Sequence, residues 1–336
     1  MPLPVLRLAT VALCAVLPAL PALAAEPAAQ LTVYTYDSFA SEWGPGPELK
    51  KRFEQRCACS VRFVGAEDGV ALLNRLRLEG ARSRADVIVG LDDSLMEEAR
   101  AQGLTQPHGV DYGSVPLVDA LAWSDADFVP FDYGYFAFIY DSAHTARPPA
   151  SLAELVSGEA RVIYQDPRTS TPGLGLVHWM KAVFGGQAAA RWSQLAANTV
   201  TVTGGWTEAY GLFLEGEADL VLSYTTSPAY HLLTEQTDRY RAAMFSEGHV
   251  AQVELAAVAA GAREPALARD FVAFLLERDT QALIAVSNWM LPVRSDVELP
   301  PDFAALPQPQ RIGFDPATVS ASRQDWVREW RSAVSR

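Results

Sequence analysis

Apolar positions along the chain follow two alternating patterns. Short apolar runs rich in β-branched and aromatic residues predict strands, and segments with apolar residues every three or four positions predict amphipathic helices. Because the two kinds of segment alternate, the sequence predicts an α/β fold. We expect strands at 31–36, 61–64, 86–89, 135–140, 161–164, 200–203, 219–223 and 250–258, and helices at 48–55, 69–79, 93–101, after 172, around 192, around 212, and at 264–277, 280–286 and 317–334, with 103–127 mostly loop.

One complete α/β unit lies between two of these strands, 135–140 and 250–258. This insertion implies two lobes joined by two crossing strands. Such a hinge lets a cleft close over a ligand. We expect lobe 1 to comprise 25–131 and 258–292, and lobe 2 to comprise 132–257 and 293–336.

The segment 206–230 is the most informative part of the chain. Its strand, 219–223, is apolar without alternation, which is typical of a parallel strand covered on both faces. A phenol and three hydroxyls follow, and then Pro228 at the start of a helix that Ser227 is suited to cap. In open α/β sheets, ligands bind beyond the carboxyl ends of strands, where helix N-termini offer free N–H groups. The segment therefore predicts a ligand site, and an ordinary capped loop is the alternative.

The first 24 residues have the features of a secretory signal peptide. Arg7 precedes an apolar run that ends in the small-residue cleavage sequence at 22–24, so the mature chain is expected to start near Ala25. Cys14 follows Leu13 rather than a small residue, which argues against lipid attachment. No later segment approaches 18 consecutive apolar residues, so we expect a soluble, Sec-exported periplasmic protein without membrane insertion.

Charge and composition narrow the classes of partner and chemistry. With 27 basic and 40 acidic residues, the chain lacks the clustered Lys and Arg that nucleic-acid binding needs. The five histidines are scattered, and no known catalytic or phosphate-loop motif occurs, so we expect neither a metal, nor a cofactor, nor catalysis. Cys57 and Cys59 predict a local disulfide in an oxidising compartment, and a redox or metal role is the alternative.

Longer motifs run in one order along the chain: YTYDSF (34–39), WGPGP (43–47), EDGVALLNRLRLEG (67–80), FDYGYFAF (131–138), YQDPRTSTPGLG (164–175), WTEAYGLFL (206–214), SYTTSPAYH (223–231), FSEGH (245–249) and NWMLPV (288–293). Together they resemble the bacterial periplasmic thiamine-binding proteins, the solute-binding subunits of ABC importers. The resemblance covers nearly the whole mature chain and is thinnest at 103–127 and 294–312. It implies the two-lobed type II periplasmic binding protein fold, with two strands crossing the hinge.

The resemblance also implies a set of ligand-binding residues and a set of partners. The partners would be thiamine, thiamine monophosphate, thiamine diphosphate and the permease subunits of an ABC transporter. A flat aromatic cation suits Tyr and Trp faces, and a phosphate suits hydroxyls and helix N-termini. The residues implied are Asp68, Gly69, Ser170, Thr171, Trp206, Tyr224, Thr225, Thr226 and Ser227 as contacts, with Tyr36, Tyr230 and Trp289 as aromatic walls.

Three other functions stay open from the residues. A polyamine receptor needs several carboxylates that face the cleft. A ferric-ion receptor needs adjacent tyrosines, and the chain has no Tyr-Tyr pair. An exported enzyme that degrades or dephosphorylates thiamine compounds is the third; a thiaminase would need a nucleophilic cysteine in the cleft, whereas Cys57 and Cys59 follow the first long helix.

Overall fold

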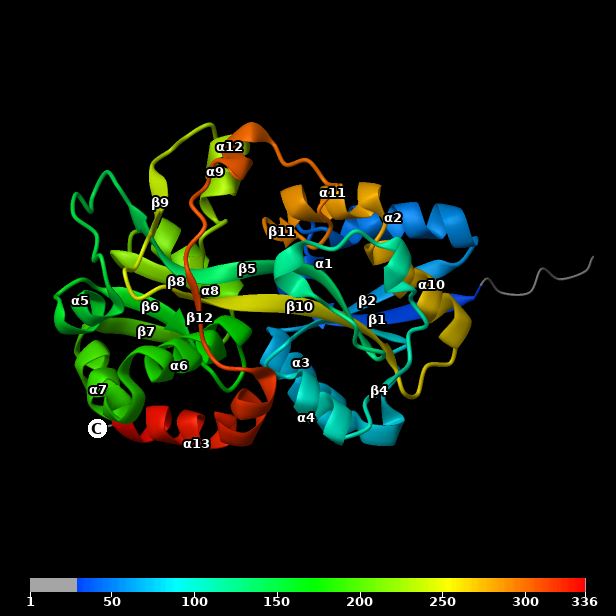
Figure 1. The fold of residues 1–336 in the computed structure, drawn as a ribbon, viewed down its shortest axis with the longest axis horizontal. Coiled ribbons are helices and arrows are strands. Elements are labelled where there is room, and N and C mark those ends of the chain that lie inside the picture. Colours follow the sequence, from blue (N-terminus) through cyan, green and yellow to red (C-terminus); the bar gives the residue numbers. More distant parts are fainter. Residues whose placement is uncertain (1–28, 336) are drawn as a thin grey trace, which may run out of the picture.

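The computed structural model describes residues 29–335 (Figure 1). The expected signal peptide, the start near Ala25 and Cys14 lie outside the described residues. Within 29–335, no helix is long and apolar enough to cross a membrane.

The described strands form one mixed sheet with the order β2-β1-β3-β10-β5-β8-β6-β7, and the shorter strands β4, β9, β11 and β12 pair along β5 and β10. The strands are β1 (Gln30–Tyr36), β2 (Ser60–Ala66), β3 (Val87–Asp92), β4 (Thr105–Gln106), β5 (Phe128–Asp141), β6 (Val162–Gln165), β7 (Thr199–Thr203), β8 (Leu220–Tyr224), β9 (Tyr240–Ala243), β10 (His249–Ala259), β11 (Leu291–Pro292) and β12 (Arg311–Ile312). The helices are α1 (Asp37–Ala40), α2 (Gly46–Cys57), α3 (Gly69–Glu79), α4 (Met96–Ala101), α5 (Leu152–Ser157), α6 (Thr171–Phe184), α7 (Ala188–Asn198), α8 (Trp206–Leu214), α9 (Pro228–Leu233), α10 (Pro265–Leu275), α11 (Arg278–Ser287), α12 (Pro301–Ala304) and α13 (Pro316–Val334), with short 3₁₀ turns η1 (Gly80–Arg82), η2 (Tyr112–Ser114), η3 (Asp119–Leu121) and η4 (Gly185–Gln187).

The long strands β5 and β10 pair antiparallel in the middle of the sheet and extend into both halves of the molecule (Figure 1). On β5, Phe128 and Phe131 pack in the hydrophobic core of the first half, and Phe136 and Phe138 pack in that of the second. The inserted α/β unit and the two crossing strands therefore appear as the sequence pattern predicts. On β10, Val253, Leu255, Ala256 and Ala257 pack in the first core, so the exact lobe boundaries stay a proposal.

The C-terminal helix α13 packs mainly on the second half. Its Trp330 is buried and donates a 3.2 Å hydrogen bond from Nε1 to the hydroxyl of Tyr164. It also touches the first half, because Arg323 forms an ion pair with Glu98 on α4. Trp330 therefore packs in the core of the second half, and α13 contacts both halves on one side of the molecule (Figure 1).

Two local expectations at the end of β8 need correction. The apolar strand β8 is parallel only to β6, because its other neighbour, β5, runs antiparallel to it. Ser227 does precede α9, but its side chain does not cap that helix. Its hydroxyl instead lies 2.7 Å from the hydroxyl of Ser223 and accepts a hydrogen bond from the backbone N–H of Tyr224.

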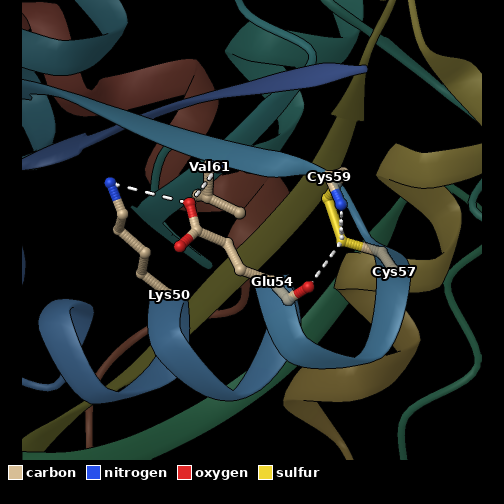
Figure 2. Close-up of a disulfide and its surroundings, with 5 residues drawn as sticks. All are labelled: Lys50, Glu54, Cys57, Cys59 and Val61. Atoms are coloured by element: carbon tan, nitrogen blue, oxygen red, sulfur yellow. Dashed lines mark hydrogen bonds and ion pairs between the residues drawn. A yellow bond between two sulfur atoms is a disulfide. The ribbon is translucent and has the colours of Figure 1, made fainter. Parts of the chain in front are cut away.

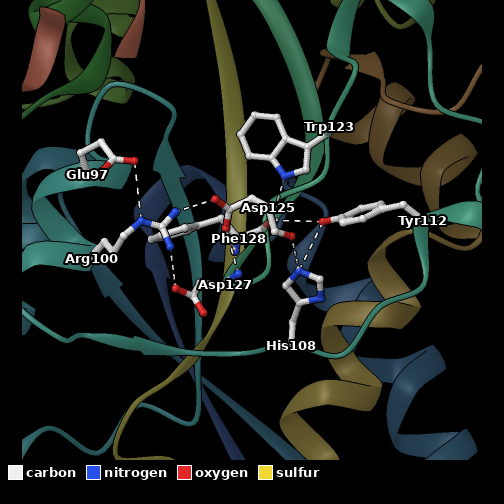
Figure 3. A network of polar contacts seen from close by, with 8 residues as sticks. All are labelled: Glu97, Arg100, His108, Tyr112, Trp123, Asp125, Asp127 and Phe128. Atoms are coloured by element: carbon white, nitrogen blue, oxygen red, sulfur yellow. Dashed lines mark hydrogen bonds and ion pairs between the residues drawn. The ribbon is translucent and has the colours of Figure 1, made fainter. Parts of the chain in front are cut away.

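The region 103–127 is mostly irregular, as expected, and polar contacts fix it against the first half (Figure 3). Arg100 on α4 pairs with Asp125 and with Asp127, the latter at 2.6 Å. The side chains of Tyr112 and Trp123 donate hydrogen bonds of 3.1 and 2.8 Å to the carbonyl of Phe128, at the start of β5. This network connects the loop to one of the crossing strands.

The structure joins Cys57 and Cys59 in a disulfide between the end of α2 and the start of β2 (Figure 2). Beside it, the carboxylate of Glu54 accepts a 2.7 Å hydrogen bond from the backbone N–H of Val61 and lies 3.7 Å from the ammonium of Lys50. The disulfide therefore adds a covalent connection to a corner that polar contacts already hold.

Candidate ligand site

A cavity of about 540 Å³ lies where the two halves of the molecule face each other. This volume is within the range of small-molecule sites. Within the described residues, no Lys, Arg or His lines it. Its lining residues are Tyr36, Ser38, Trp43, Asp68, Thr171, Pro172, Trp206, Thr207, Tyr210, Gly211, Leu214, Tyr224, Ser227, Tyr230, Thr234, Glu254, Asn288, Trp289 and Met290.

One wall of the cavity is an aromatic stack at the start of α8. The rings of Trp206 and Tyr210 stack with centroids 4.9 Å apart, because residues four apart lie on one face of a helix. The indole N–H of Trp206 donates a 2.8 Å hydrogen bond to the hydroxyl of Ser223, which fixes the ring. Trp43, which is 53% exposed, lies at the rim of the cavity, and the centroid of its ring is 6.2 Å from that of Trp206.

A second aromatic pair, Tyr230 on α9 and Trp289 after α11, also lines the cavity. The two rings meet edge to face with centroids 5.5 Å apart. Trp289 has a φ of +56°, a left-handed conformation that is rare for a bulky residue. Such strain is characteristic of functional sites, where surrounding structure holds the residue in place.

Acidic and amide groups form the floor of the cavity. Tyr36 donates a 2.6 Å hydrogen bond to the Oε2 atom of Glu254, and Gln252 donates one of 2.8 Å to the Oε1 atom. Glu254 on β10 pairs directly with Asp132 on β5, so two carboxyl groups face each other across the crossing strands. The amide of Asn288 donates a 2.7 Å hydrogen bond to Asp132.

These carboxyl groups resist ionisation because they are buried together. Burial raises the pKa of Asp132 to about 7. Burial and the charge of Asp132 raise the pKa of Glu254 well above its ordinary value. Two neighbouring buried carboxylates cannot both ionise at low cost, so the pair holds a proton near neutral pH. A cation in the cavity would favour loss of that proton.

Asp68 connects the two halves at the N-terminus of α3. Its Oδ1 atom accepts hydrogen bonds from the backbone N–H of Gly69 at 2.7 Å and from the hydroxyl of Thr171 at 3.1 Å. Its Oδ2 atom accepts hydrogen bonds from the hydroxyl of Ser170 at 2.8 Å and from the backbone N–H of Trp206 at 3.3 Å. Burial nevertheless raises the pKa of Asp68. Asp68 caps α3, and its carboxylate also holds α6 and α8 against α3.

The structure gathers most of the site residues expected from the sequence around one cavity. Gly69, Ser170, Thr225 and Thr226 do not line it. The hydroxyl of Ser170 is committed to Asp68, and Thr225 and Thr226 are buried behind Tyr224. Those that line it are Tyr36, Asp68, Thr171, Trp206, Tyr224, Ser227, Tyr230 and Trp289.

Sequence reasoning missed several lining residues, notably Trp43, Tyr210, Glu254 and Asn288, and also Asp132 beneath the floor. A signal existed for the acidic pair, because Asp132 and Glu254 interrupt strands that are mostly apolar. Buried charged residues in a central strand are rare without a function or a partner. Among residues 29–335, no cluster of three or more His, Cys, Asp or Glu side chains could hold a metal ion.

Comparisons with known proteins agree on one family. The family model described as "Bacterial extracellular solute-binding protein" matches residues 48–310. A thiamine-binding periplasmic protein of Escherichia coli is 55% identical over 309 residues, which cover 91% of this chain and 94% of that one. The relative of the same name in Brucella abortus is 50% identical and covers 98% of this chain and 99% of its own. A solved structure named periplasmic thiamin binding protein has a TM-score of 0.88 and 55% identity, and covers 91% of this chain and 96% of that one.

Proposed function

We propose that this chain, which belongs to the thiamine-binding periplasmic proteins within the bacterial extracellular solute-binding protein family, captures thiamine in the cavity between its two halves. The names of its relatives support both the ligand and the periplasmic location. The same names describe binding proteins, which supports a receptor over an enzyme. Delivery to the permease of an ABC importer follows from the role of such receptors.

The observation that carries the proposal is a cavity with aromatic walls and an acidic floor. Thiamine combines an aromatic aminopyrimidine with a cationic thiazolium ring. The faces of Trp206 and Trp289 suit flat rings and a delocalised positive charge, at about 0.5–2 kcal/mol for each good cation–π contact. The carboxyl group of Glu254 suits the positive charge and the amino group of such a ligand.

We propose that thiamine monophosphate and diphosphate bind in the same cavity, but more weakly than thiamine. A phosphate would find the hydroxyl of Thr207, since that of Thr171 already donates to Asp68. It would also approach the carboxylates of Asp68 and Glu254 without a basic side chain to offset them. The hydroxyl of Ser170, expected from the sequence to meet a phosphate, already donates to Asp68.

The aromatic walls argue against a polyamine, because a flexible aliphatic polycation has no flat ring to pack against two aromatic pairs. A thiaminase would need a nucleophilic cysteine in the cleft. Within the described residues, no cysteine lines the cavity, and Cys57 and Cys59 are joined to each other.

Isothermal titration calorimetry with thiamine, its two phosphates, spermidine and ferric citrate tests the proposal. We expect saturable binding of one thiamine per chain, progressively weaker binding of the mono- and diphosphate, and no saturable binding of the other two. Mass spectrometry of the ligands after incubation should show them unchanged. Saturable binding of spermidine without thiamine binding, or turnover of thiamine, would contradict the proposal.

A further inference from the structure

A second cavity, of about 560 Å³, lies at the edge of the sheet in the first half of the molecule. Its walls come from β1, β2, α3, η1 and the turn after β10. Five arginines line it, with Glu79 as its single carboxylate. We call it the arginine pocket; its arginines are Arg62, Arg75, Arg82, Arg84 and Arg263.

Most of this positive charge has no counter-ion. In the part of the chain that the structure describes, Arg62, Arg82 and Arg84 form no ion pair. The protein as a whole carries a net charge of −13, so solubility does not explain five like charges in one hollow. Gathered like charges repel each other, and an anion that binds between them removes this cost.

The floor of the arginine pocket holds one guanidinium in a fixed orientation. Arg75 donates hydrogen bonds of 2.8 Å to Glu79 and 3.0 Å to the carbonyl of Gly65, and its guanidinium carbon lies 4.8 Å from the centroid of the Tyr34 ring. The hydroxyl of Tyr34 in turn donates a 2.9 Å hydrogen bond to Glu79. A fixed guanidinium loses little entropy when it binds an anion, and its planar geometry matches phosphate oxygens.

At another wall, the exposed side chain of Arg263 lies near two groups of the first half. Its guanidinium lies 3.4 Å from the hydroxyl of Thr32 and 3.8 Å from the buried carboxylate of Asp86. Arg75 therefore presents donors in a defined orientation, whereas Arg62, Arg82, Arg84 and Arg263 supply exposed positive charge.

We propose that the arginine pocket binds a polyvalent phosphate, at a site distinct from the ligand cavity. No residue lines both cavities, and they lie at opposite ends of α3: Asp68 precedes its first turn, and Glu79 is its last residue. The volume of the pocket accommodates a diphosphate or a phospholipid headgroup, and Leu78, which is 80% exposed, stands at its rim. The proposal does not depend on which ligand the first cavity takes.

Calorimetry with sodium pyrophosphate at constant ionic strength tests for a soluble phosphate, and co-sedimentation with phosphatidylglycerol vesicles against pure phosphatidylcholine vesicles tests for a lipid headgroup. We expect saturable binding of pyrophosphate, of phosphatidylglycerol vesicles, or of both. The double variant Arg62→Gln/Arg84→Gln should weaken it at least about tenfold, because each lost guanidinium removes charge-assisted contacts. Thermal stability should be unchanged, because both side chains are exposed and without ion pairs.

The matched control is Arg147→Gln/Arg331→Gln, which removes the same charge from exposed positions outside the pocket. It should bind either probe like the wild type, and both double variants should bind thiamine like the wild type. Absence of saturable binding in both arms would overturn the proposal, as would an equal loss in the control variant. Displacement of pyrophosphate by thiamine would also overturn it, since the anion would then occupy the first cavity.

Discussion

Single residues with unusual conformations or environments mark the ligand cavity more clearly than any motif does. Trp289 has a left-handed backbone conformation, and Asp132 and Glu254 are carboxyl groups buried side by side. Neither arrangement favours folding by itself, since the first is strained and the second is desolvated. A cation in the cavity would offset the cost of the buried carboxyl pair, and the ring of Trp289 would offer it an aromatic face; we therefore propose that these residues take part in binding.

We predict that Trp289→Ala weakens thiamine binding by about 2 kcal/mol or more, because buried Trp and Tyr anchors dominate binding energy. Trp289→Phe should restore much of the loss, since it keeps an aromatic face. The midpoint of thermal unfolding of the ligand-free protein should change by only a few degrees, because the side chain is only partly buried. Normal binding with a much lower unfolding temperature would show that Trp289 serves packing alone.

Affinity for thiamine should rise between about pH 5 and pH 8. Burial raises the pKa of Asp132 to about 7, and the pKa of Glu254 is also raised, so the carboxyl pair becomes more negative over this range. Calorimetry in buffers of different ionisation enthalpy should detect proton release on binding. Glu254→Gln should weaken binding at pH 8 by about 1.5–3 kcal/mol and flatten the pH dependence.

The same raised pKa values have the opposite effect on stability: affinity for thiamine should rise with pH, whereas the free energy of unfolding of the ligand-free protein should fall. Between about pH 4 and pH 7 the folded chain retains protons that the unfolded chain releases, so these two groups lower the free energy of unfolding as pH rises. Glu254→Gln should reduce that slope in urea unfolding curves. Glu159→Gln, an exposed control outside the cavity, should leave both pH profiles unchanged.

At the scale of elements, the N-terminus of α3 is the main polar connection across the cleft. The carboxylate of Asp68 accepts bonds from α3 itself and from the starts of α6 and α8. Next to it, the backbone N–H of Ala71 donates a 2.7 Å hydrogen bond to the carbonyl of Thr169. These contacts hold three helix N-termini together beside the cavity.

Asp68→Ala should therefore lower both stability and affinity. Loss of the cap should reduce the free energy of unfolding by about 1 kcal/mol or more. Thiamine binding should weaken at least about tenfold, because the closed arrangement loses a charged acceptor shared by both halves. Small-angle X-ray scattering at saturating thiamine should show a less compact variant.

The control for this variant is Asp315→Ala, which removes the cap of α13, where Asp315 accepts a 2.9 Å hydrogen bond from the N–H of Thr318. It should lower stability by a similar amount and leave affinity unchanged. An affinity loss in Asp315→Ala equal to that in Asp68→Ala would show that the effect comes from stability alone.

The Cys57–Cys59 disulfide should contribute little to stability, because it closes a very short loop. The double variant Cys57→Ser/Cys59→Ser should lose less than about 2 kcal/mol in urea unfolding. Thiamine affinity should stay unchanged, since neither cysteine lines the cavity. A tenfold loss of affinity would instead connect this corner of α2 to the ligand site.

For the whole molecule, the sequence predicts the architecture better than it predicts the site. The strand β10, the second part of β5 and the inserted unit follow from apolar patterns, and the helix expected at 69–79 matches α3. Residues 128–134, the first part of β5, were not predicted to form a strand. Short elements such as α5 and β9 were not predicted, because a few residues carry too weak a periodic signal.

Expected site residues line the cavity where motifs place aromatic and polar residues at strand and helix ends, as with Tyr224, Tyr230 and Trp289. Other lining residues were missed where function depends on pairing between distant strands. Glu254 meets Asp132 only because β10 and β5 pair in one register, and no local pattern encodes that register. The hydrogen bond from the hydroxyl of Ser170 to Asp68 likewise joins residues far apart in the sequence, so no local pattern indicates it.

A crystal structure of the protein grown with thiamine tests the central claim most directly. We expect one thiamine in the cavity between the two halves, with at least one ring against Trp206 or Trp289 and a positively charged or amino group within hydrogen-bond distance of Glu254 or Asp68. Thiamine bound outside this cavity, or an empty cavity in crystals grown at saturating thiamine, would show that the cavity between the two halves is not the thiamine site.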